Sequence, residues 1–212
     1  MEKTKLAAFT FDDGPVEYTG DSTAMRILHT FERYGQQATF FYVGQKIKES
    51  NVPEMKFAQS IGCEAGNHTF SHCFLTEKSA QEIEEELTQT AQAEEKVLGT
   101  APKLVRLPYL ASNETVLATV DYPMINCSVD SRDWADAPVE EIIQRIMDAD
   151  AAGELENAVV LLHEQYATTA AAVEYLIPTL LEKGYRFVTV SELAAKNGIT
   201  LEKHKIYGRM QQ

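Results

Sequence analysis

Short apolar runs alternate with amphipathic helical patterns along the whole chain, and this alternation constrains the fold more than any other feature. The apolar runs are continuous, as at residues 40–43 and 159–162, instead of alternating with polar residues. A strand of this kind is buried on both faces, which is typical of a parallel sheet covered by helices. The sequence therefore predicts an α/β fold built on a parallel sheet.

Seven strand patterns and six helical patterns follow one another. The strand patterns start near residues 5, 37, 61, 104, 124, 158 and 186, and the helical patterns cover residues 22–34, 52–60, 79–98, 114–120, 138–152 and 169–183. Ser79 and Glu82 match a capping box at the start of the third helix. Pro178 predicts either a kink in the last helix or the true start of that helix.

Polar side chains that could carry chemistry stand at or just beyond the carboxyl ends of these strands. They are Asp12 and Asp13, His68, Arg106, Asp130 with Asp133, and His163. Enzymes built on (β/α) barrels place their chemistry on this rim. An open doubly wound sheet gathers its ligands at a single switch point. The distribution over five strand ends therefore favours a barrel of about seven parallel strands with outer helices.

Length and composition predict one domain and few kinds of partner. The 212 residues contain no composition break, and we expect a domain over residues 1–197 followed by a polar C-terminal tail over residues 198–212. The net charge of -13 disfavours nucleic acid and anionic membrane surfaces, so we expect neither as a partner. No apolar stretch has the length of a membrane span. We expect a monomer.

Cysteine usage and the amino terminus bear on the compartment. The three cysteines are an odd number and too few for a disulfide framework, so we expect reduced thiols. Residues 1–5 lead into the first strand without the apolar region of a signal peptide. The chain as written is therefore expected in the cytoplasm, or outside the cell if the sequence is a mature or excised domain.

Two adjacent carboxylates follow the first strand, in the segment Thr10-Phe11-Asp12-Asp13-Gly14-Pro15. Side chains along an extended backbone point in alternate directions, so the two carboxylates should diverge. One of them could then hold a metal ion while the other handles a proton. A solvated turn is the alternative, because Asp-Gly-Pro is common turn chemistry.

His68 and His72 are four residues apart, so both imidazoles can face one point. Two imidazoles and one carboxylate form a facial triad that leaves positions open for water and substrate, as expected for catalytic Zn²⁺ or a similar divalent ion. Asp13 is the natural third ligand. Two alternatives stay open: ordinary loop histidines, or a structural zinc site that includes Cys63 and Cys73.

His163 ends the most apolar strand and is a candidate general acid. Asp130 and Asp133 could orient its ring and raise its pKa, as an acid that works near neutral pH requires. Arg106 could hold Asp12 ionised through a charge-assisted pair. The alternatives are a buried structural histidine and a surface arginine. Trp134 and Leu161 could form a small apolar pocket, although core packing explains them equally well.

Five segments resemble, in their order and separations, the motifs of the polysaccharide deacetylase family, the NodB-homology domains of carbohydrate esterase family four. The segments are residues 10–15, 68–72, 106–109, 130–134 and 161–163. The resemblance runs from Lys5 to about Leu193. It implies a distorted, incomplete (β/α) barrel that removes acetyl groups from a glycan such as acetyl-xylan, chitooligosaccharide or peptidoglycan. It also implies a divalent metal, Zn²⁺ first and Co²⁺ as a second possibility.

Carried over by position, the resemblance assigns a role to ten residues. The metal ligands would be Asp13, His68 and His72. Asp12 would be the base, tethered by Arg106, and His163 would be the acid, supported by Asp133. The backbone N–H of Tyr109 would bind the oxyanion, and Trp134 with Leu161 would receive the acetyl methyl group.

The chain departs from the family pattern at two places. Leu107 and Leu110 flank Pro108-Tyr109 where the family usually has Arg-Pro-Pro-Tyr/Phe-Gly, and Glu164 stands where an aspartate commonly follows the last histidine. Neither change removes a group that the chemistry needs. Two rival functions stay open: an inactive carbohydrate-binding module on the same fold, and a metal-dependent amidohydrolase that acts on a small acyl amide.

Overall fold

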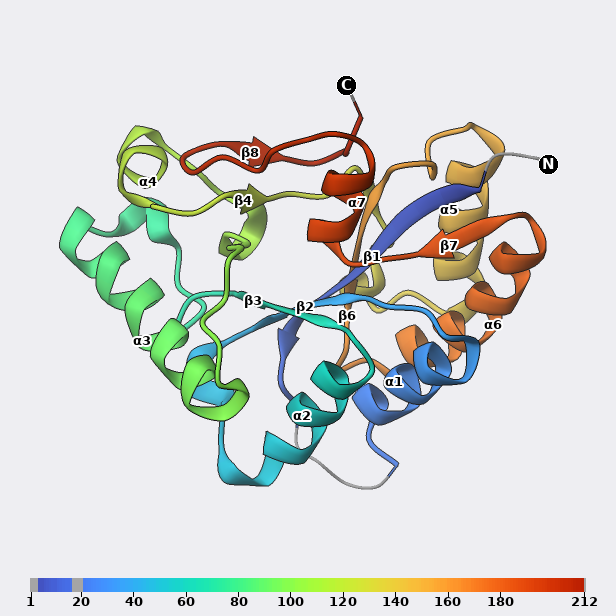
Figure 1. The fold of residues 1–212 in the computed structure, drawn as a ribbon, viewed down its shortest axis with the longest axis horizontal. Helices are drawn as coiled ribbons and strands as arrows, with labels where there is room; N and C mark the ends of the chain where they lie inside the picture. Colours follow the sequence, from blue (N-terminus) through green and yellow to red (C-terminus); the bar gives the residue numbers. More distant parts are fainter. Residues whose placement is uncertain (1–3, 17–20, 212) are drawn as a thin grey trace.

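Parallel strands run through the centre of the molecule and helices surround them (Figure 1). The computed structural model describes residues 4–16 and 21–211. The strands are β1 (Lys5–Gly14), β2 (Thr39–Tyr42), β3 (Glu64–Asn67), β4 (Met124–Ile125), β5 (Val129–Asp130), β6 (Val159–His163), β7 (Tyr185–Phe187) and β8 (Ile206–Tyr207). The α-helices are α1 (Thr23–Tyr34), α2 (Val52–Ser60), α3 (Ala80–Leu98), α4 (Glu114–Thr119), α5 (Val139–Ala151), α6 (Ala167–Glu182) and α7 (Val190–Lys196).

The sheet is an incomplete barrel, as predicted. Its main part has the order β3-β2-β1-β6-β5, with β7 paired to β1, and all of these pairs are parallel. Single parallel bridges from Val105 to Asn67 and to Met124 continue the curve from β3 to β4, which pairs with β8. No pairing between β4 and β5 appears in the part of the chain that the structure describes. The barrel therefore stays open at that point.

Strand β1 is the centre of this arrangement because it pairs with three other strands. Its first residues, Lys5–Ala7, pair with β7, and its later residues pair with β2 on one side and β6 on the other. The register with β6 places Asp12 directly opposite His163. Two residues that are 151 positions apart in the sequence are thus neighbours at the carboxyl ends of adjacent strands.

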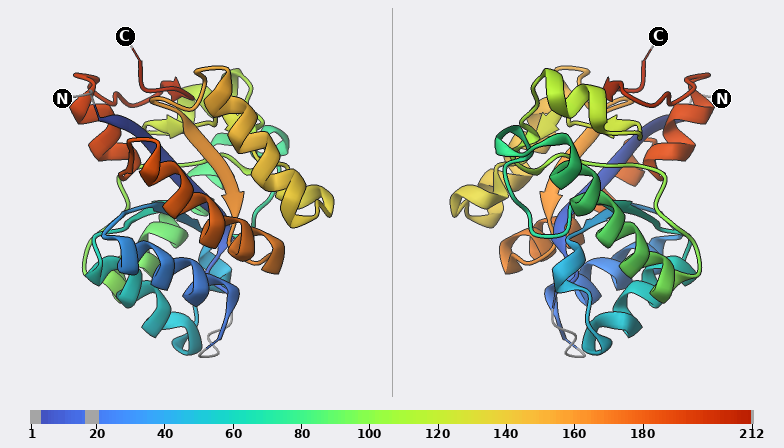
Figure 2. Two further views of the ribbon diagram at one scale, coloured as in Figure 1. Left: turned by 90° about the vertical axis from the view of Figure 1, so that its right-hand side faces the viewer. Right: turned by 90° about the vertical axis from the view of Figure 1, so that its left-hand side faces the viewer.

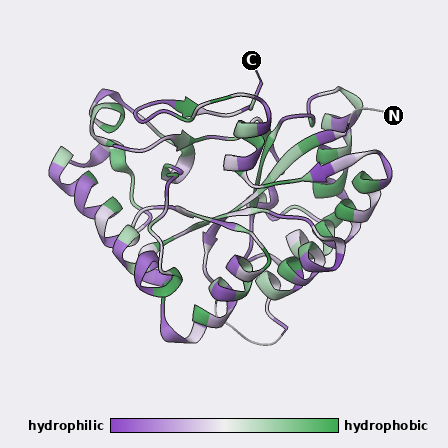
Figure 3. Cartoon of the chain, in the orientation of Figure 1, coloured by the Kyte–Doolittle hydropathy of each residue, from purple (hydrophilic) through white to green (hydrophobic). Residues whose placement is uncertain are grey.

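The helices bury apolar faces against the strands from two sides. Figure 2 shows α1, α5 and α6 packed together on one side, and α2 with α3 on the other. Helix α1 starts at the N-cap Ser22, whose hydroxyl accepts from Met25 N at 3.3 Å, and it directs Phe31 into the core. There Phe31 meets the ring of Phe11 edge-on. Helix α3 is largely hydrophilic along its length (Figure 3).

The structure differs from the predicted elements in four places. Residues 104–106 contribute only the isolated bridges of Val105, and the predicted strand at 124–129 splits into β4 and β5. Helix α6 begins at Ala167 and continues through Pro178, so Pro178 does not mark its start. Helix α7 was not predicted; it begins after Thr189, whose hydroxyl accepts from Glu192 N at 3.1 Å.

The C-terminal segment is polar, as predicted, but its described part packs on the domain. Strand β8 pairs with β4, and Met210 is fully buried among residues of the core. Met210 N also donates to Asn157 O at 2.9 Å. The boundary at residue 197 stays a prediction. Among the described helices, none combines the length and apolarity that a membrane span requires.

Candidate active site

Strand β1 ends in the two carboxylates that the sequence singled out. Asp12 is almost fully buried, whereas the backbone of Asp13 turns into the left-handed region with φ of 68°. Such a backbone is costly for a residue with a Cβ, so neighbouring groups must hold it. Lys46 Nζ donates to Asp13 O at 2.7 Å, and Gln165 Nε2 donates to Asp13 Oδ2 at 3.1 Å. These contacts fix the direction of the Asp13 carboxylate.

Two imidazoles converge on the other oxygen of Asp13. His72 Nε2 lies 3.1 Å and His68 Nε2 lies 3.5 Å from Asp13 Oδ1. His68 Nδ1 lies 2.8 Å from the carbonyl oxygen of Arg106. A carbonyl only accepts, so this nitrogen carries a proton, and Nε2 is the nitrogen that faces the carboxylate.

This cluster fits a divalent cation. The ligand atoms of Asp13, His68 and His72 all lie within 4.8 Å of one another, and Asp13 Oδ1 is buried without a hydrogen-bond donor. One carboxylate oxygen and two imidazole nitrogens are the donor set of open catalytic zinc sites. Burial raises the pKa of Asp13, but the two adjacent imidazoles lower it by a larger amount. The pKa of Asp13 therefore lies well below its ordinary value. The carboxylate is therefore ionised at neutral pH.

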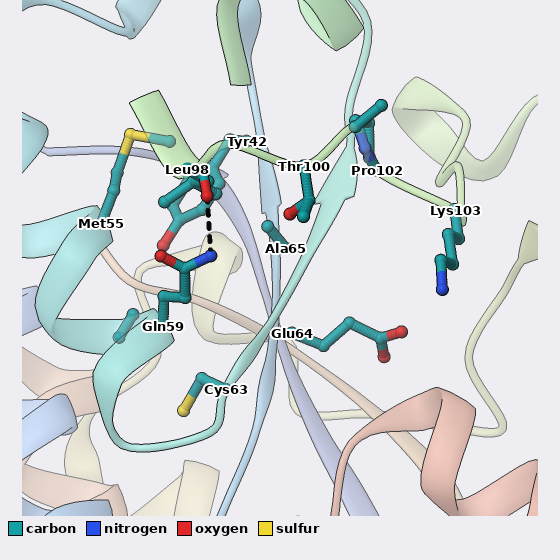
Figure 4. Close-up of a pocket in the computed structure, with 12 residues that line it drawn as sticks. Tyr42, Met55, Gln59, Cys63, Glu64, Ala65, Leu98, Thr100, Pro102 and Lys103 are labelled. Atoms are coloured by element: carbon teal, nitrogen blue, oxygen red, sulfur yellow. Dashed lines mark hydrogen bonds between the residues drawn. The ribbon is translucent and has the colours of Figure 1, made fainter. Parts of the chain in front are cut away.

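Cys63 and Cys73 do not join the cluster, which is the only group of three or more metal-binding side chains among the described residues. Cys63 lines a separate cavity of about 250 Å³ with Tyr42, Met55 and Leu98 (Figure 4). Burial raises the pKa of the Cys63 thiol to about 12, which disfavours the thiolate that zinc requires. The structural zinc alternative has no support in this arrangement.

Arg106 is a buried residue and not a surface arginine. Its Nη1 donates to Asp12 Oδ1 at 2.7 Å and to Thr10 Oγ1 at 2.6 Å. Its Nε donates to the carbonyl of Ile125 at 3.0 Å, and the guanidinium lies over the ring of Phe41. A guanidinium fixed at so many points holds one oxygen of Asp12 in place.

His163 forms a pair with Asp133. Its Nδ1 lies 2.8 Å from Asp133 Oδ1, while Asp133 Oδ2 accepts from His163 N at 2.7 Å and from Thr169 Oγ1 at 2.6 Å. Burial lowers the pKa of His163, but the hydrogen bond to Asp133 and the charges of Asp12, Asp133 and Asp13 outweigh it, so the pKa is raised. Such an imidazole suits the role of a general acid.

Asp130 does not orient His163, contrary to the expectation from the sequence. Its Oδ1 instead accepts from Arg132 N at 2.9 Å and from Trp134 Nε1 at 3.3 Å. Asp130 thus holds the indole of Trp134, and Asp133 alone pairs with the histidine. The two carboxylates are three residues apart, and the left-handed turn at Arg132, with φ of 54°, separates their directions.

A cleft of about 500 Å³ opens above these groups. The metal-ligand cluster, Asp12 and His163 lie in it, and apolar residues form much of its wall. Leu161 and the half-exposed Trp134 belong to this wall. Tyr109 also lines the cleft and has a left-handed φ of 58°.

Sequence reasoning missed four residues that hold the site. Thr10, Lys46, Gln165 and Thr169 each bond a catalytic candidate or a ligand candidate. The position of Gln165, two residues after His163 on the rim, was a weak indication that it belongs to the site. Thr10 opens the motif at residues 10–15 but received no role there, and Lys46 and Thr169 stand in segments whose patterns predict only loop or helix.

Glu164, one of the two departures from the family pattern, is buried beside Gly14. Its Oε1 accepts from Val16 N at 3.2 Å. A Cβ on residue 14 would meet this oxygen at 1.9 Å. The longer acid at position 164 therefore fills the space that glycine leaves, and it supports the turn after Asp13.

The fold is an incomplete (β/α) barrel, and its carboxyl rim carries this cluster, a buried carboxylate and a histidine–aspartate pair. The family model for polysaccharide deacetylase matches residues 2–123. The chain therefore belongs to the polysaccharide deacetylase family.

Individual relatives agree with this assignment. The peptidoglycan-N-acetylmuramic acid deacetylase of Bacillus subtilis is 34% identical over 189 residues, which cover 89% of this chain and 38% of that protein. The chain thus spans about two fifths of this curated relative. The Xyl-CE4 domain of a multidomain xylanase from the hindgut metagenome of Trinervitermes trinervoides has a TM-score of 0.89 at 33% identity, with 98% of each chain covered. A family 4 acetyl xylan esterase from Clostridium thermocellum, solved with a cobalt ion, has a TM-score of 0.88 at 28% identity and covers 98% of this chain and 100% of its own.

Proposed function

We propose that this chain hydrolyses acetyl groups from an acetylated glycan and uses one divalent metal ion, Zn²⁺ or alternatively Co²⁺. The observation that carries the proposal is the position of Asp12. It lies opposite His163 in the sheet register, is bound by Arg106, and has its Oδ2 3.7 Å from His68 Nε2. A base, a metal-ligand cluster and an acid therefore share one cleft.

The metal ligands would be Asp13, His68 and His72. A divalent ion in such a site supplies Lewis acidity and lowers the pKa of water. The protein holds the ligands in place for it: Gln165 and Lys46 fix Asp13, and the carbonyl of Arg106 fixes the tautomer of His68.

Asp12 is the general base in this proposal. Because Arg106 occupies Asp12 Oδ1, Oδ2 is the oxygen that takes the proton from the attacking water. The new C–O bond forms at the acetyl carbonyl, whose oxygen becomes negatively charged. The backbone N–H of Tyr109 stabilises this charge from the wall of the cleft.

His163 completes the reaction as the general acid. Its Nδ1 is held by Asp133, so its Nε2 gives the proton to the leaving oxygen or nitrogen when the acyl bond breaks. An amide needs this proton most, because an amine anion is a very poor leaving group. The acetyl methyl group would lie against Trp134 and Leu161.

The same contacts favour an enzyme over an inactive carbohydrate-binding module, because such a module has no use for a buried base or a polarised imidazole. Two of the relatives named above are a peptidoglycan deacetylase and an acetyl xylan esterase, and either an ester or an amide suits these residues. The charge of -13 favours an uncharged glycan over an anionic cell-wall polymer.

Acetate release from protein stripped of metal and then reloaded with Zn²⁺ or Co²⁺ tests the proposal. Acetyl-xylan, chitooligosaccharides and peptidoglycan are the substrates, and a small acyl amide is the comparison. We expect release only after reloading. Asp12→Asn should keep the metal and lose turnover, whereas Asp121→Asn, at an exposed position, should keep both. Turnover by Asp12→Asn would refute the assignment of the base, and glycan binding without release would favour the binding module.

A further inference from the structure

The two histidines of the metal-ligand cluster are held by different parts of the fold. His68 follows strand β3 directly, and its backbone N donates to Tyr42 O at 2.9 Å. Its ring is fixed by the carbonyl of Arg106. His72 lies beyond a loop at residues 69–71, and its own backbone is left-handed with φ of 58°. The sheet therefore places the first imidazole, whereas the conformation of this loop places the second.

Glu86, on helix α3, binds the backbone of this loop. Its Oε2 accepts from Phe70 N and from Ser71 N, both at 2.8 Å, and its Oε1 accepts from Ser71 Oγ at 2.7 Å. One carboxylate thus takes up three donors from two consecutive residues. Hydrogen bonds from backbone N–H groups to an ionised carboxylate are roughly twice as strong as neutral ones. Glu86 has no part in the proposed reaction.

The opposite side of the loop is bound to Gly44 and Gln45. Gly44 N donates to Thr69 O at 3.0 Å, and Gln45 N donates to Phe70 O at 2.9 Å. A Cβ on Gly44 would lie 2.7 Å from the ring of Phe70, so the two segments are in close contact. The donors of the loop therefore face α3, and its acceptors face the other support. Loss of the Glu86 carboxylate would free one side of the loop and leave the other side bound.

The loop in turn fixes the backbone of His72. Thr69 Oγ1 accepts from His72 N at 3.1 Å, and Thr69 also has a left-handed φ, of 64°. Two left-handed residues in one short loop are costly and persist only where the surrounding contacts impose them. At the end of this series of contacts, His72 Nε2 lies 3.1 Å from Asp13 Oδ1. A shift of the loop would move this nitrogen away from the other ligand atoms.

We propose that Glu86 is a positioning residue for the metal site, whose carboxylate holds residues 70–71 so that His72 completes the ligand set of a divalent cation. This proposal rests on the proposed function, because that function supplies the metal. Glu86 acts through the reach of its two oxygens and not through its charge. Loss of a contact that orients a metal ligand typically weakens metal binding by about 10- to 100-fold.

Two substitutions separate the reach of Glu86 from its charge. Glu86→Asp keeps the charge but is one methylene shorter, so it loses the contacts with the two backbone N–H groups. Glu86→Gln removes the charge, but its amide oxygen can accept from both N–H groups while its NH₂ group donates to the Ser71 hydroxyl. Glu85→Gln removes the same charge from an exposed neighbour on α3, which accepts from Gln81 Nε2, and is the matched control.

The affinity of metal-free protein for Zn²⁺, measured by competition with a chromophoric chelator, is the readout. We expect the Kd to rise about 10- to 100-fold in Glu86→Asp. In Glu86→Gln and in Glu85→Gln it should change by less than about threefold, because solvent and salt screen a charge outside the site. The visible absorption of bound Co²⁺ should also change in Glu86→Asp, since the coordination of the ion changes when His72 moves.

Two results would overturn the role of Glu86. Equal Zn²⁺ affinities in Glu86→Asp and the wild type, even with a lower Tm of the metal-free variant, would leave Glu86 with a role in folding stability alone. An equal loss of affinity in Glu86→Gln and Glu86→Asp would make the charge the cause and not the position of the loop.

The binding measurement also separates this proposal from the proposed function, because it needs no substrate. Weaker Zn²⁺ binding by Glu86→Asp alone would support the role of Glu86 even if the wild type released no acetate from any glycan. Unchanged binding would overturn that role even if acetate release were confirmed. A wild type that binds neither Zn²⁺ nor Co²⁺ would refute the metal of the proposed function and this role together.

Discussion

Replacing Asp133 with asparagine is expected to lower the pKa of His163 by about one unit. The carboxylate is almost fully buried and accepts three hydrogen bonds, two from His163 and one from Thr169. Hydrogen bonds to charged groups contribute about 1.5–3 kcal/mol and neutral ones about 0.5–1.5 kcal/mol. The difference, on the order of 1–1.5 kcal/mol, corresponds to roughly one pKa unit.

The three donors around Asp133 also limit how the new amide of the Asp133→Asn variant can sit. Oδ2 accepts from two donors, so an amide NH₂ group at that position would leave His163 N without an acceptor. With the amide oxygen there, the NH₂ group faces His163 Nδ1, which then has to accept and cannot also carry a proton, so the doubly protonated ring is disfavoured. Either orientation removes support for the protonated ring, and the first also costs about 1–3 kcal/mol of stability.

The pH dependence of kcat/KM for acetate release measures this effect. The general acid works only while His163 is protonated, so activity falls as the pH rises through its pKa. In Asp133→Asn the alkaline limb should move toward lower pH by about one unit. Asp121→Asn removes the same charge at an exposed position and should leave the limb in place. An unmoved limb in Asp133→Asn protein with normal metal content and Tm would refute the reasoning.

Two further predictions concern stability. In a urea titration, Arg106→Met should lower the free energy of unfolding by about 3–5 kcal/mol, because it leaves the buried carboxylate of Asp12 unpaired. Arg26→Met removes an exposed ion pair and should change the free energy of unfolding by about 0–1 kcal/mol. Glu94→Met should raise Tm, and by more at about pH 8 than at about pH 5. Burial raises the pKa of Glu94, so the unfolded chain ionises first and stability falls as the pH rises between the two pKa values. Glu95→Met, at an exposed position on the same helix, should show no such pH dependence.

The succession of strands along the chain and the candidate site residues could be read from the sequence because both are local. Asp12, His68 and His163 each lie at or directly beyond the end of an apolar run, and parallel strands all end on one rim. The capping box at Ser79 was recognisable for the same reason, since its two partners are three residues apart. The predicted strand at 124–129 splits, because residues 126–128 lie between β4 and β5 and belong to neither strand.

The packing of β8 could not be predicted because its stability comes from distant contacts. Strand β8 has two residues and pairs with β4, about 80 positions earlier. Met210 lies inside a polar segment of the sequence but is buried in the hydrophobic core. No local pattern distinguishes such a segment from a solvated tail.

By itself, the sequence determined the fold class and the chemical types present on the rim, because strand periodicity and residue identity are properties of neighbouring positions. Only the tertiary structure decided which groups act together. It paired Asp133 and not Asp130 with His163, and it brought Gln165 and Lys46 to Asp13. These contacts join residues that are 30 or more positions apart, and their geometry depends on strand register and loop conformation, which are set when the whole core packs.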